Sequence, residues 1–237
     1  MTAKQPILTL LTDFGSSPYV AQMKGVILSV LPQATMVDIS HDISPQNIAE
    51  AAFVLASAAP AFPPGCVHCA VVDPTVGAER RIILLHASSQ FFLAPDNGLL
   101  TLILARSPAA FAWSVENKHF FRRPVSPTFH GRDIFAPVAA ALASGERPYA
   151  FGPQLDVASL ARLLVPEPHE TGGVLHGEVI YIDRFGNLIT NITAKAVSSL
   201  GDPSYLHVVC GAADIRGISR TYADAQPGDI IAVVGRP

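Results

Sequence analysis

Four polar side chains stand next to apolar runs and could together act on a small molecule. Asp13 follows the run ILTLLT and Asp73 follows CVHCAVV, while Arg80 comes seven residues later and His130 stands in PTFHGRDIFAP. A carboxylate, a guanidinium and an imidazole can bind polar groups of a ligand and transfer protons. Each also has a plain structural alternative: a helix cap for Asp13, an ion pair for Asp73 with Arg80, and a polar helix start for His130.

A second polar group lies in YIDRFGNLITNI, residues 181–192. Asp183, Phe185 and Asn187 surround a glycine there. Because Asp and Asn are ordinary turn residues, this group is equally explained as a β-hairpin turn.

The elements that must position these residues alternate along the first half of the chain. Apolar runs at 7–12, 35–40 and 66–72 predict strands, with a helix between Pro18 and Pro32 and another from Ser44-Pro45 onward. This β-α-β-α-β order favours an α/β fold, a mostly parallel sheet with helices on both faces. Ligands of such sheets bind beyond the carboxyl ends of the strands, where Asp13 and Asp73 are expected.

Two further strands, RIILLHA and QFFLAP, and a helix after His130 complete the predicted α/β domain, residues 1–163. We expect Asp133 to cap that helix and Pro137 to stand in its first turn. The Pro-, Gly- and acid-rich segment 164–173 predicts a linker. Short strand-like runs, IIAVVG among them, then predict a small antiparallel β-domain at 174–237.

Composition and charge argue against several classes of function. Hydrophobic residues make up 49% of the chain, charged residues 15%, and the net charge is −3, which argues against nucleic-acid binding. The apolar segment near the N-terminus is too short to span a membrane and has no signal-type cleavage site, so a cytoplasmic location is expected. Cys66 and Cys69 flank His68 in a C-x-x-C. No second pair follows at zinc spacing, so we expect inert buried thiols and no metal.

Several motifs occur together in the order of one family: LTDFG, MKG, VVDPTVG, APDNGLLT, TFHGRDIFAP and DRFGNLITNI. Over nearly its whole length the sequence resembles the S-adenosylmethionine (SAM) hydroxide adenosyltransferases, relatives of fluorinase and chlorinase. The resemblance implies a C-terminal β-barrel-like domain and a homotrimer with active sites at subunit interfaces. It implies hydrolysis of SAM to adenosine and L-methionine, with SAM as substrate and no separate cofactor.

The resemblance also implies roles for particular residues. Asp73, Arg80 and His130 would surround the attacking water, and Asp13 would bind the ribose hydroxyls. The other expected substrate contacts are Phe129, Asp183, Phe185 and Asn187.

The chemistry explains why these residue types suit the reaction. Attack at the ribose 5′-carbon expels neutral methionine from a sulfonium, so the leaving group needs no acid, whereas water must be aligned and lose a proton. The positive end of a helix dipole near His130 favours a neutral imidazole. Either His130 or Asp73 could then accept the proton.

Two rival functions stay open. Halogenase relatives have tyrosines where this chain has Asp73 and His130, and a carboxylate in a dry pocket repels a halide, so water is favoured as nucleophile. A non-catalytic binder of SAM or adenosine is the other rival. It is motivated by the chain's end at IIAVVGRP, because the family continues with a further strand expected to help hold SAM. Thr75 also replaces a glycine that is usual in the family's DPGVG motif.

Overall fold

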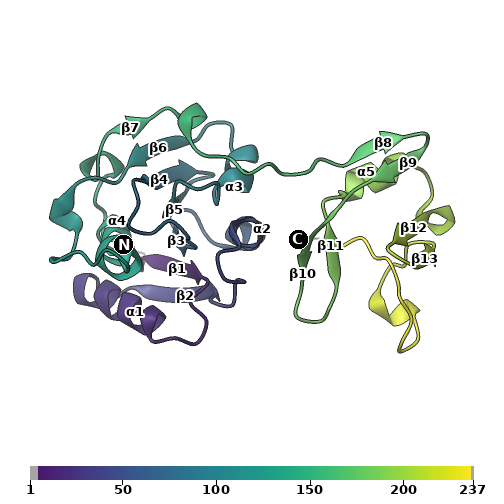
Figure 1. The fold of residues 1–237 in the computed structure, drawn as a ribbon, viewed down its shortest axis with the longest axis horizontal. Helices are drawn as coiled ribbons and strands as arrows, with labels where there is room; N and C mark the ends of the chain where they lie inside the picture. The colour runs from purple at the N-terminus through teal and green to yellow at the C-terminus, as the bar shows by residue number, and fades with distance from the viewer. Residues whose placement is uncertain (1–4, 236–237) are drawn as a thin grey trace. The chain divides into compact units, whose positions relative to one another are not determined.

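The structure is a computed structural model that describes residues 5–235. The chain folds into two compact units, the first ending at Leu163 and the second beginning at Leu164 (Figure 1). Each unit is described by itself below.

A seven-stranded sheet forms the centre of the first unit, in the order β2-β1-β3-β5-β4-β6-β7. The strands are β1 (Ile7–Thr12), β2 (Thr35–Ser40), β3 (Val67–Val71), β4 (Ile82–Ala87), β5 (Gln90–Pro95), β6 (Phe111–Ser114) and β7 (Gln154–Leu155). Strands β2, β1, β3 and β5 pair in parallel, whereas β4 and β7 run antiparallel to their neighbours. The sheet is thus mostly parallel, as predicted.

Helices cover both faces of this sheet, which confirms the α/β prediction (Figure 1). The helices are α1 (Tyr19–Val30), α2 (Ile48–Ala58), α3 (Thr101–Ala105) and α4 (Ala136–Ala143). α1 and α4 share one buried core, and α2 and α3 share the other. Strand β1 shows how one apolar run serves both: Leu8 and Leu10 pack in the α1–α4 core, whereas Leu11 packs in the α2–α3 core.

The predicted start of the second helix is wrong. Helix α2 begins at Ile48 rather than at Ser44-Pro45, because Gln46 has a φ of +66°, which no α-helix accommodates. Asn47 is the cap, and its side chain accepts a hydrogen bond from the Glu50 amide. Helix α1 begins at Tyr19, with Pro18 just before it and no side-chain cap.

The segment after His130 is a π-helix, Gly131–Phe135, which runs directly into α4. Pro137 stands in the first turn of α4 as predicted. The prediction that Asp133 caps the helix is wrong. Its carboxylate, 1% exposed, instead accepts hydrogen bonds from the Ser126 amide (2.9 Å) and from Nε of Arg132 (2.7 Å), so it anchors the preceding loop.

The second unit consists of three separate two-stranded antiparallel sheets and one short helix. Its elements are β8 (His169–Thr171), β9 (Val174–His176), β10 (Val179–Ile182), β11 (Leu188–Thr190), α5 (Ala194–Ser199), β12 (His207–Cys210) and β13 (Ala213–Arg216). The antiparallel character is confirmed, whereas closure into a barrel stays a prediction. Strand β8 lies inside the predicted linker 164–173. The predicted strand IIAVVG, residues 230–235, forms only a bridge from Val233 to Ser219.

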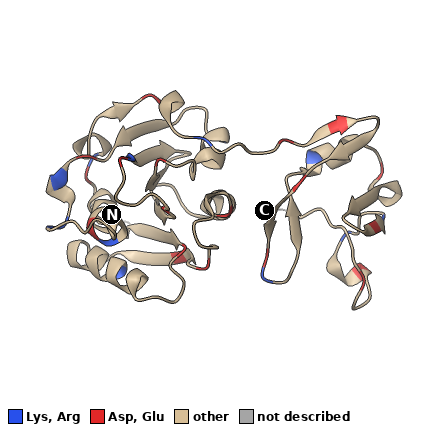
Figure 2. Cartoon of the chain, in the orientation of Figure 1, with Lys and Arg blue, Asp and Glu red and all other residues tan. Residues whose placement is uncertain are grey.

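Within residues 5–235, no helix combines the length and apolar character needed to cross a membrane. Lys and Arg are scattered over both units (Figure 2). Cys66 and Cys69 are buried, and burial raises their thiol pKa values to about 11 and about 12, so both thiols are protonated and inert at neutral pH. In the described part of the chain, no group of three His, Cys, Asp or Glu residues could hold a metal ion.

Candidate active site

Arg80 joins Asp73 and His130 into one buried cluster. Asp73 follows the end of β3, and a turn of seven residues brings Arg80 back to it before β4 begins. The guanidinium donates from both Nε (2.8 Å) and Nη2 to Oδ2 of Asp73, and from Nη2 to Nδ1 of His130 (2.9 Å). The side chains of Asp73 and Arg80 are only 4% and 9% exposed. The two charges are therefore paired and largely removed from water, and the lower local dielectric constant strengthens their attraction.

The contact with Arg80 determines the protonation of His130. A guanidinium can only donate, so Nδ1 of His130 accepts, and the hydrogen of the neutral ring is carried by Nε2. Burial lowers the pKa of His130, the charge of Arg80 lowers it further, and Asp73 and Asp133 oppose the shift. The neutral imidazole is thus explained by burial and Arg80 at the site itself.

Oδ1 of Asp73 is the carboxylate oxygen that Arg80 leaves free. The hydroxyl of Thr75 donates to it from 3.3 Å. The replacement of glycine by threonine in this turn therefore adds a hydrogen bond to the carboxylate. The turn still has Asp73 and Arg80 in direct contact.

The Asp73–Arg80–His130 cluster borders a pocket of about 350 Å³ at the carboxyl ends of β1 and β3. Asp13, Asp73, Phe129 and His130, four residues predicted from sequence, line it. Since β1 and β3 are parallel neighbours, their ends bring Asp13 and Asp73 to the same edge of the sheet. The structure thereby joins five of the predicted site residues, with Arg80 held by two of the lining side chains.

Gly77 allows the two loops that form the cluster to approach each other. It has a φ of +86°, and a Cβ atom at this position would lie 2.6 Å from the carbonyl oxygen of Pro127. One loop carries Asp73 and Arg80, and the other carries His130. A glycine at position 77 therefore sets the spacing across which Arg80 reaches His130.

An aromatic wall on the pocket was missed in the sequence. Phe14, Tyr19 and Phe129 pack edge to face, with ring centroids 5.1–6.1 Å apart, and all three line the pocket. A Cβ atom on Gly131 would lie within 3.5 Å of Phe14, Phe129 and Met23, so the glycine permits this packing. The sequence did offer one signal for Phe14, because it directly follows Asp13 beyond a strand end, where ligands of such sheets bind. The other missed lining residues are Gln46, Val71, Pro74, Val76, Thr128 and Gly131.

Comparisons with known proteins identify the family of this chain. The SAM hydroxide adenosyltransferase N-terminal domain matches residues 8–152, and the C-terminal domain of the same family matches residues 177–236. The chain belongs to the SAM hydroxide adenosyltransferase family. The family resemblance seen in the sequence is thus confirmed.

Individual relatives fall into two groups. The chain is 36% identical to an (R)-S-adenosyl-L-methionine hydrolase of Salinispora tropica, over 98% of this chain and 87% of that protein. A fluorinase of Actinoplanes is 31% identical, over 83% of this chain and 74% of that protein. A solved structure of an uncharacterized conserved protein from Thermotoga maritima superposes with a TM-score of 0.90 at 35% identity, over 95% of this chain and 88% of that one.

The adenosyltransferase residues predicted in the second unit lie in one hairpin turn, between β10 and β11. Oδ1 of Asp183 accepts from the amides of Phe185 (2.8 Å) and Asn187 (2.9 Å), and Oδ2 accepts from the Asn187 side chain (2.7 Å). These bonds lower the pKa of Asp183, that from the Asn187 side chain most. Phe185 is 91% exposed. Asp183 and Asn187 thus build the turn, and Phe185 is presented at its tip.

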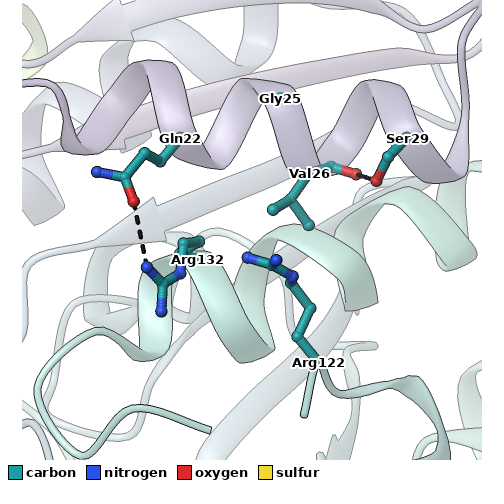
Figure 3. A pocket seen from close by; sticks show the side chains of 6 residues that line it. All are labelled: Gln22, Gly25, Val26, Ser29, Arg122 and Arg132. Carbon is teal, nitrogen blue, oxygen red and sulfur yellow. Dashed lines mark hydrogen bonds between the residues drawn. The ribbon is translucent and has the colours of Figure 1, made fainter. Parts of the chain in front are cut away.

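A second, more open hollow of about 410 Å³ lies on the first unit between α1 and the π-helix. Arg122 and Arg132 reach under α1, and Arg132 donates to the Gln22 side chain from 3.2 Å (Figure 3). Both arginines pair with the buried Asp133, so their charges are partly neutralised. The contacts of Asp133 with these arginines and with Ser126 hold the loop before His130.

Proposed function

We propose that this chain hydrolyses SAM to adenosine and L-methionine by attack of water at the ribose 5′-carbon. The observation that carries this function is the buried cluster of Asp73, Arg80 and His130 on the wall of the pocket. The family and its SAM hydrolase relatives identify the substrate class. The described residues supply the polar groups that such an attack requires.

In the proposed step, the water oxygen forms a bond to C5′ while the bond from C5′ to the sulfonium sulfur breaks. The electron pair of the broken bond goes to sulfur, so methionine leaves as a neutral thioether. Neutral departure needs no electrophilic assistance, and on this ground we propose a reaction without metal or other cofactor. Addition of a chelator is expected to leave the rate unchanged.

Asp73 is the proposed proton acceptor. The lone pair of His130 Nδ1 is taken by Arg80 and its Nε2 carries hydrogen, so neutral His130 has no free acceptor atom. Oδ1 of Asp73 has free lone pairs beyond its bond from Thr75. Water therefore loses its proton to Oδ1, while Nε2–H of His130 is a donor that can orient the water oxygen.

The same arrangement disfavours a halide as nucleophile. Nε and Nη2 of Arg80 already donate to Asp73 and His130, so an anion next to the cluster would face the buried carboxylate. Two like charges at contact distance repel by several kcal/mol, of the order of 4 at an effective dielectric near 20. Water is neutral and escapes this penalty.

Substrate binding is proposed as follows. Asp13 accepts hydrogen bonds from the ribose hydroxyls, since a carboxylate offers two oxygens to a vicinal diol. Phe129 and the aromatic wall contact the nucleoside and the sulfonium, a cation that aromatic faces attract. Asp183, Phe185 and Asn187 contact the rest of SAM. The proposed assembly is a cytoplasmic homotrimer with active sites at subunit interfaces and a barrel-like C-terminal domain, as the resemblance implies.

The test is product analysis with purified protein, SAM and a halide salt. Adenosine and methionine in equal amounts, at a rate independent of chloride or fluoride, support the proposal. A 5′-halogenated adenosine would assign halogenation instead. Tight SAM binding with no product after prolonged incubation would assign a binding protein.

A further inference from the structure

We propose that His41 is a positioning residue for nucleoside binding, acting through the turn that carries Asp13. This inference rests on the proposed function, because it assigns Asp13 to the ribose. His41 lies outside the pocket wall and follows β2, the strand beside β1. Its side chain is 15% exposed and contacts the turn through Thr12.

His41 holds this turn by two separate groups. Nδ1 of its ring lies 2.9 Å from Oγ1 of Thr12, and its backbone carbonyl accepts the Gly15 amide at 2.8 Å. The Thr12 hydroxyl also accepts the Phe14 amide at 3.2 Å. Both ends of the segment from Thr12 to Gly15, which includes two pocket-lining residues, are therefore bound to one residue.

Asp38 is the charged neighbour of the imidazole. Its Oδ1 lies 3.0 Å from Nε2 of His41, and its other oxygen pairs with Lys24. A carboxylate beside Nε2 favours hydrogen on that nitrogen, which leaves Nδ1 as an acceptor for the Thr12 hydroxyl. The Thr12 hydroxyl then donates to His41 and accepts from the Phe14 amide, so the direction of both hydrogen bonds is fixed.

The segment after His41 completes the clamp. The backbone amide of Gln46 donates to Oδ2 of Asp13 at 2.8 Å. Gln46 also lines the pocket and has a left-handed backbone conformation, with a φ of +66°. Asp13 is thereby fixed at its carboxylate, and its backbone is fixed through Thr12 and Gly15. A ribose diol meets a carboxylate that is already oriented, which reduces the entropy lost on binding.

Removal of the imidazole isolates this effect. His41→Ala should weaken adenosine binding and raise the KM for SAM about 10-fold, the effect of one lost partly buried hydrogen bond, while kcat changes less. Asn places an acceptor near the position of Nδ1, so His41→Asn should restore both values to within about 3-fold. Gln reaches toward Asp38 but leaves Thr12 without its partner, so His41→Gln should behave like His41→Ala.

The decisive comparison uses Asp13→Ala as background. If His41 acts through Asp13, adding His41→Ala to Asp13→Ala should leave the KM nearly unchanged, because coupled residues are not additive. His86→Ala is the matched control. It removes a partly buried imidazole from the same sheet, packed against Phe91 and away from the turn, and should leave adenosine binding unchanged.

Calorimetric titration with adenosine and steady-state kinetics with SAM are the measurements, with Trp113 fluorescence as the check of folding. Wild-type affinity in His41→Gln, or an equal loss from His41→Ala in the wild-type and Asp13→Ala backgrounds, would overturn the inference alone. Failure of the wild-type chain to bind either nucleoside would overturn the proposed function, and this inference with it.

Discussion

Nη2 of Arg80 lies 2.9 Å from Nδ1 of His130 and donates a hydrogen bond to it. This contact joins two loops that are 50 residues apart in the sequence. It makes Nδ1 the acceptor and leaves Nε2 with the hydrogen. In this arrangement Asp73, rather than His130, is the side chain able to take a proton from water.

Asp73→Asn tests that assignment. The amide keeps the shape of the carboxylate but cannot accept the proton, so kcat for SAM hydrolysis should fall roughly 10²- to 10⁴-fold with a smaller change in KM. Asp96→Asn is the control, because Asp96 pairs with Arg81 through Nε (2.8 Å) and Nη2 (2.6 Å) outside the pocket. Steady-state kinetics should show near wild-type kcat for Asp96→Asn. Equal losses in the two variants would assign Asp73 a structural role.

The pH dependence of kcat/KM reports on His130. Burial and the charge of Arg80 lower its pKa below the ordinary value near 6.5, so the ring stays neutral as the pH falls through 6.5. We expect kcat/KM to stay level there and to decline only at lower pH, where a protonated ring would repel Arg80. His130→Asn should be slower and should lose the part of this decline that comes from the imidazole, leaving any part due to protonation of the acceptor Asp73. An inflection at or above pH 6.5 that depends on His130 would contradict the account.

Gly77→Ala tests the spacing of the two loops. The added Cβ atom would clash with the Pro127 carbonyl and force the His130 loop away from Arg80, so turnover should fall at least 10-fold. Gly65→Ala is the control, since Gly65 has a similar φ of +83° with no atom within 4 Å of the added carbon. Both variants should lose about 1–2 kcal/mol of stability from the left-handed backbone. Equal turnover in the two variants would argue against the role of Gly77.

His68 should make the stability of the first unit depend on pH. The buried ring bonds through Nδ1 to Thr9 at 2.8 Å, stacks on Phe92, and its burial lowers the pKa to about 4. The unfolded chain takes up a proton near pH 6.5 and the folded chain only near 4. The free energy of unfolding should therefore fall as the pH falls between these values, by up to about 3 kcal/mol.

Urea unfolding followed by the fluorescence of Trp113, the chain's single tryptophan, measures this stability in the first unit. His68→Phe keeps an aromatic ring in the core but cannot bind a proton. Its unfolding free energy should vary much less between pH 6.5 and 4.5. An identical pH dependence in wild type and variant would show that other groups are responsible.

Much of the first unit could be predicted from the sequence, because local patterns determine it. The strands at 7–12 and 66–72 are apolar runs buried on both faces, whereas the strand at 35–40 is a more exposed edge strand. Parallel pairing of the first and third of these strands places Asp13 and Asp73 at the same end of the sheet. Gln46 escaped prediction because a left-handed φ at a glutamine has no local signal in the sequence, and its contact with Asp13 is 33 residues distant. The capping motif Ser44-Pro45 therefore gave a false helix start.

Contacts between distant segments could not be predicted in the same way. The aromatic wall joins Tyr19 on α1 to Phe129 in a loop 110 positions later, and neither residue has a local pattern that indicates the other. The tautomer of His130 likewise depends on Arg80, which the fold brings to it. The hairpin residue Phe185 was correctly placed in a turn, but its role in binding SAM is still a prediction.

Hydrolysis of SAM in water enriched in ¹⁸O tests the central claim most directly. If water attacks C5′, mass spectrometry should find one ¹⁸O atom in the 5′-hydroxyl of each adenosine and none in methionine, and Asp73→Asn should form labelled adenosine far more slowly. Unlabelled adenosine, a 5′-halogenated nucleoside, or unconsumed SAM would contradict attack of water at C5′ in this pocket.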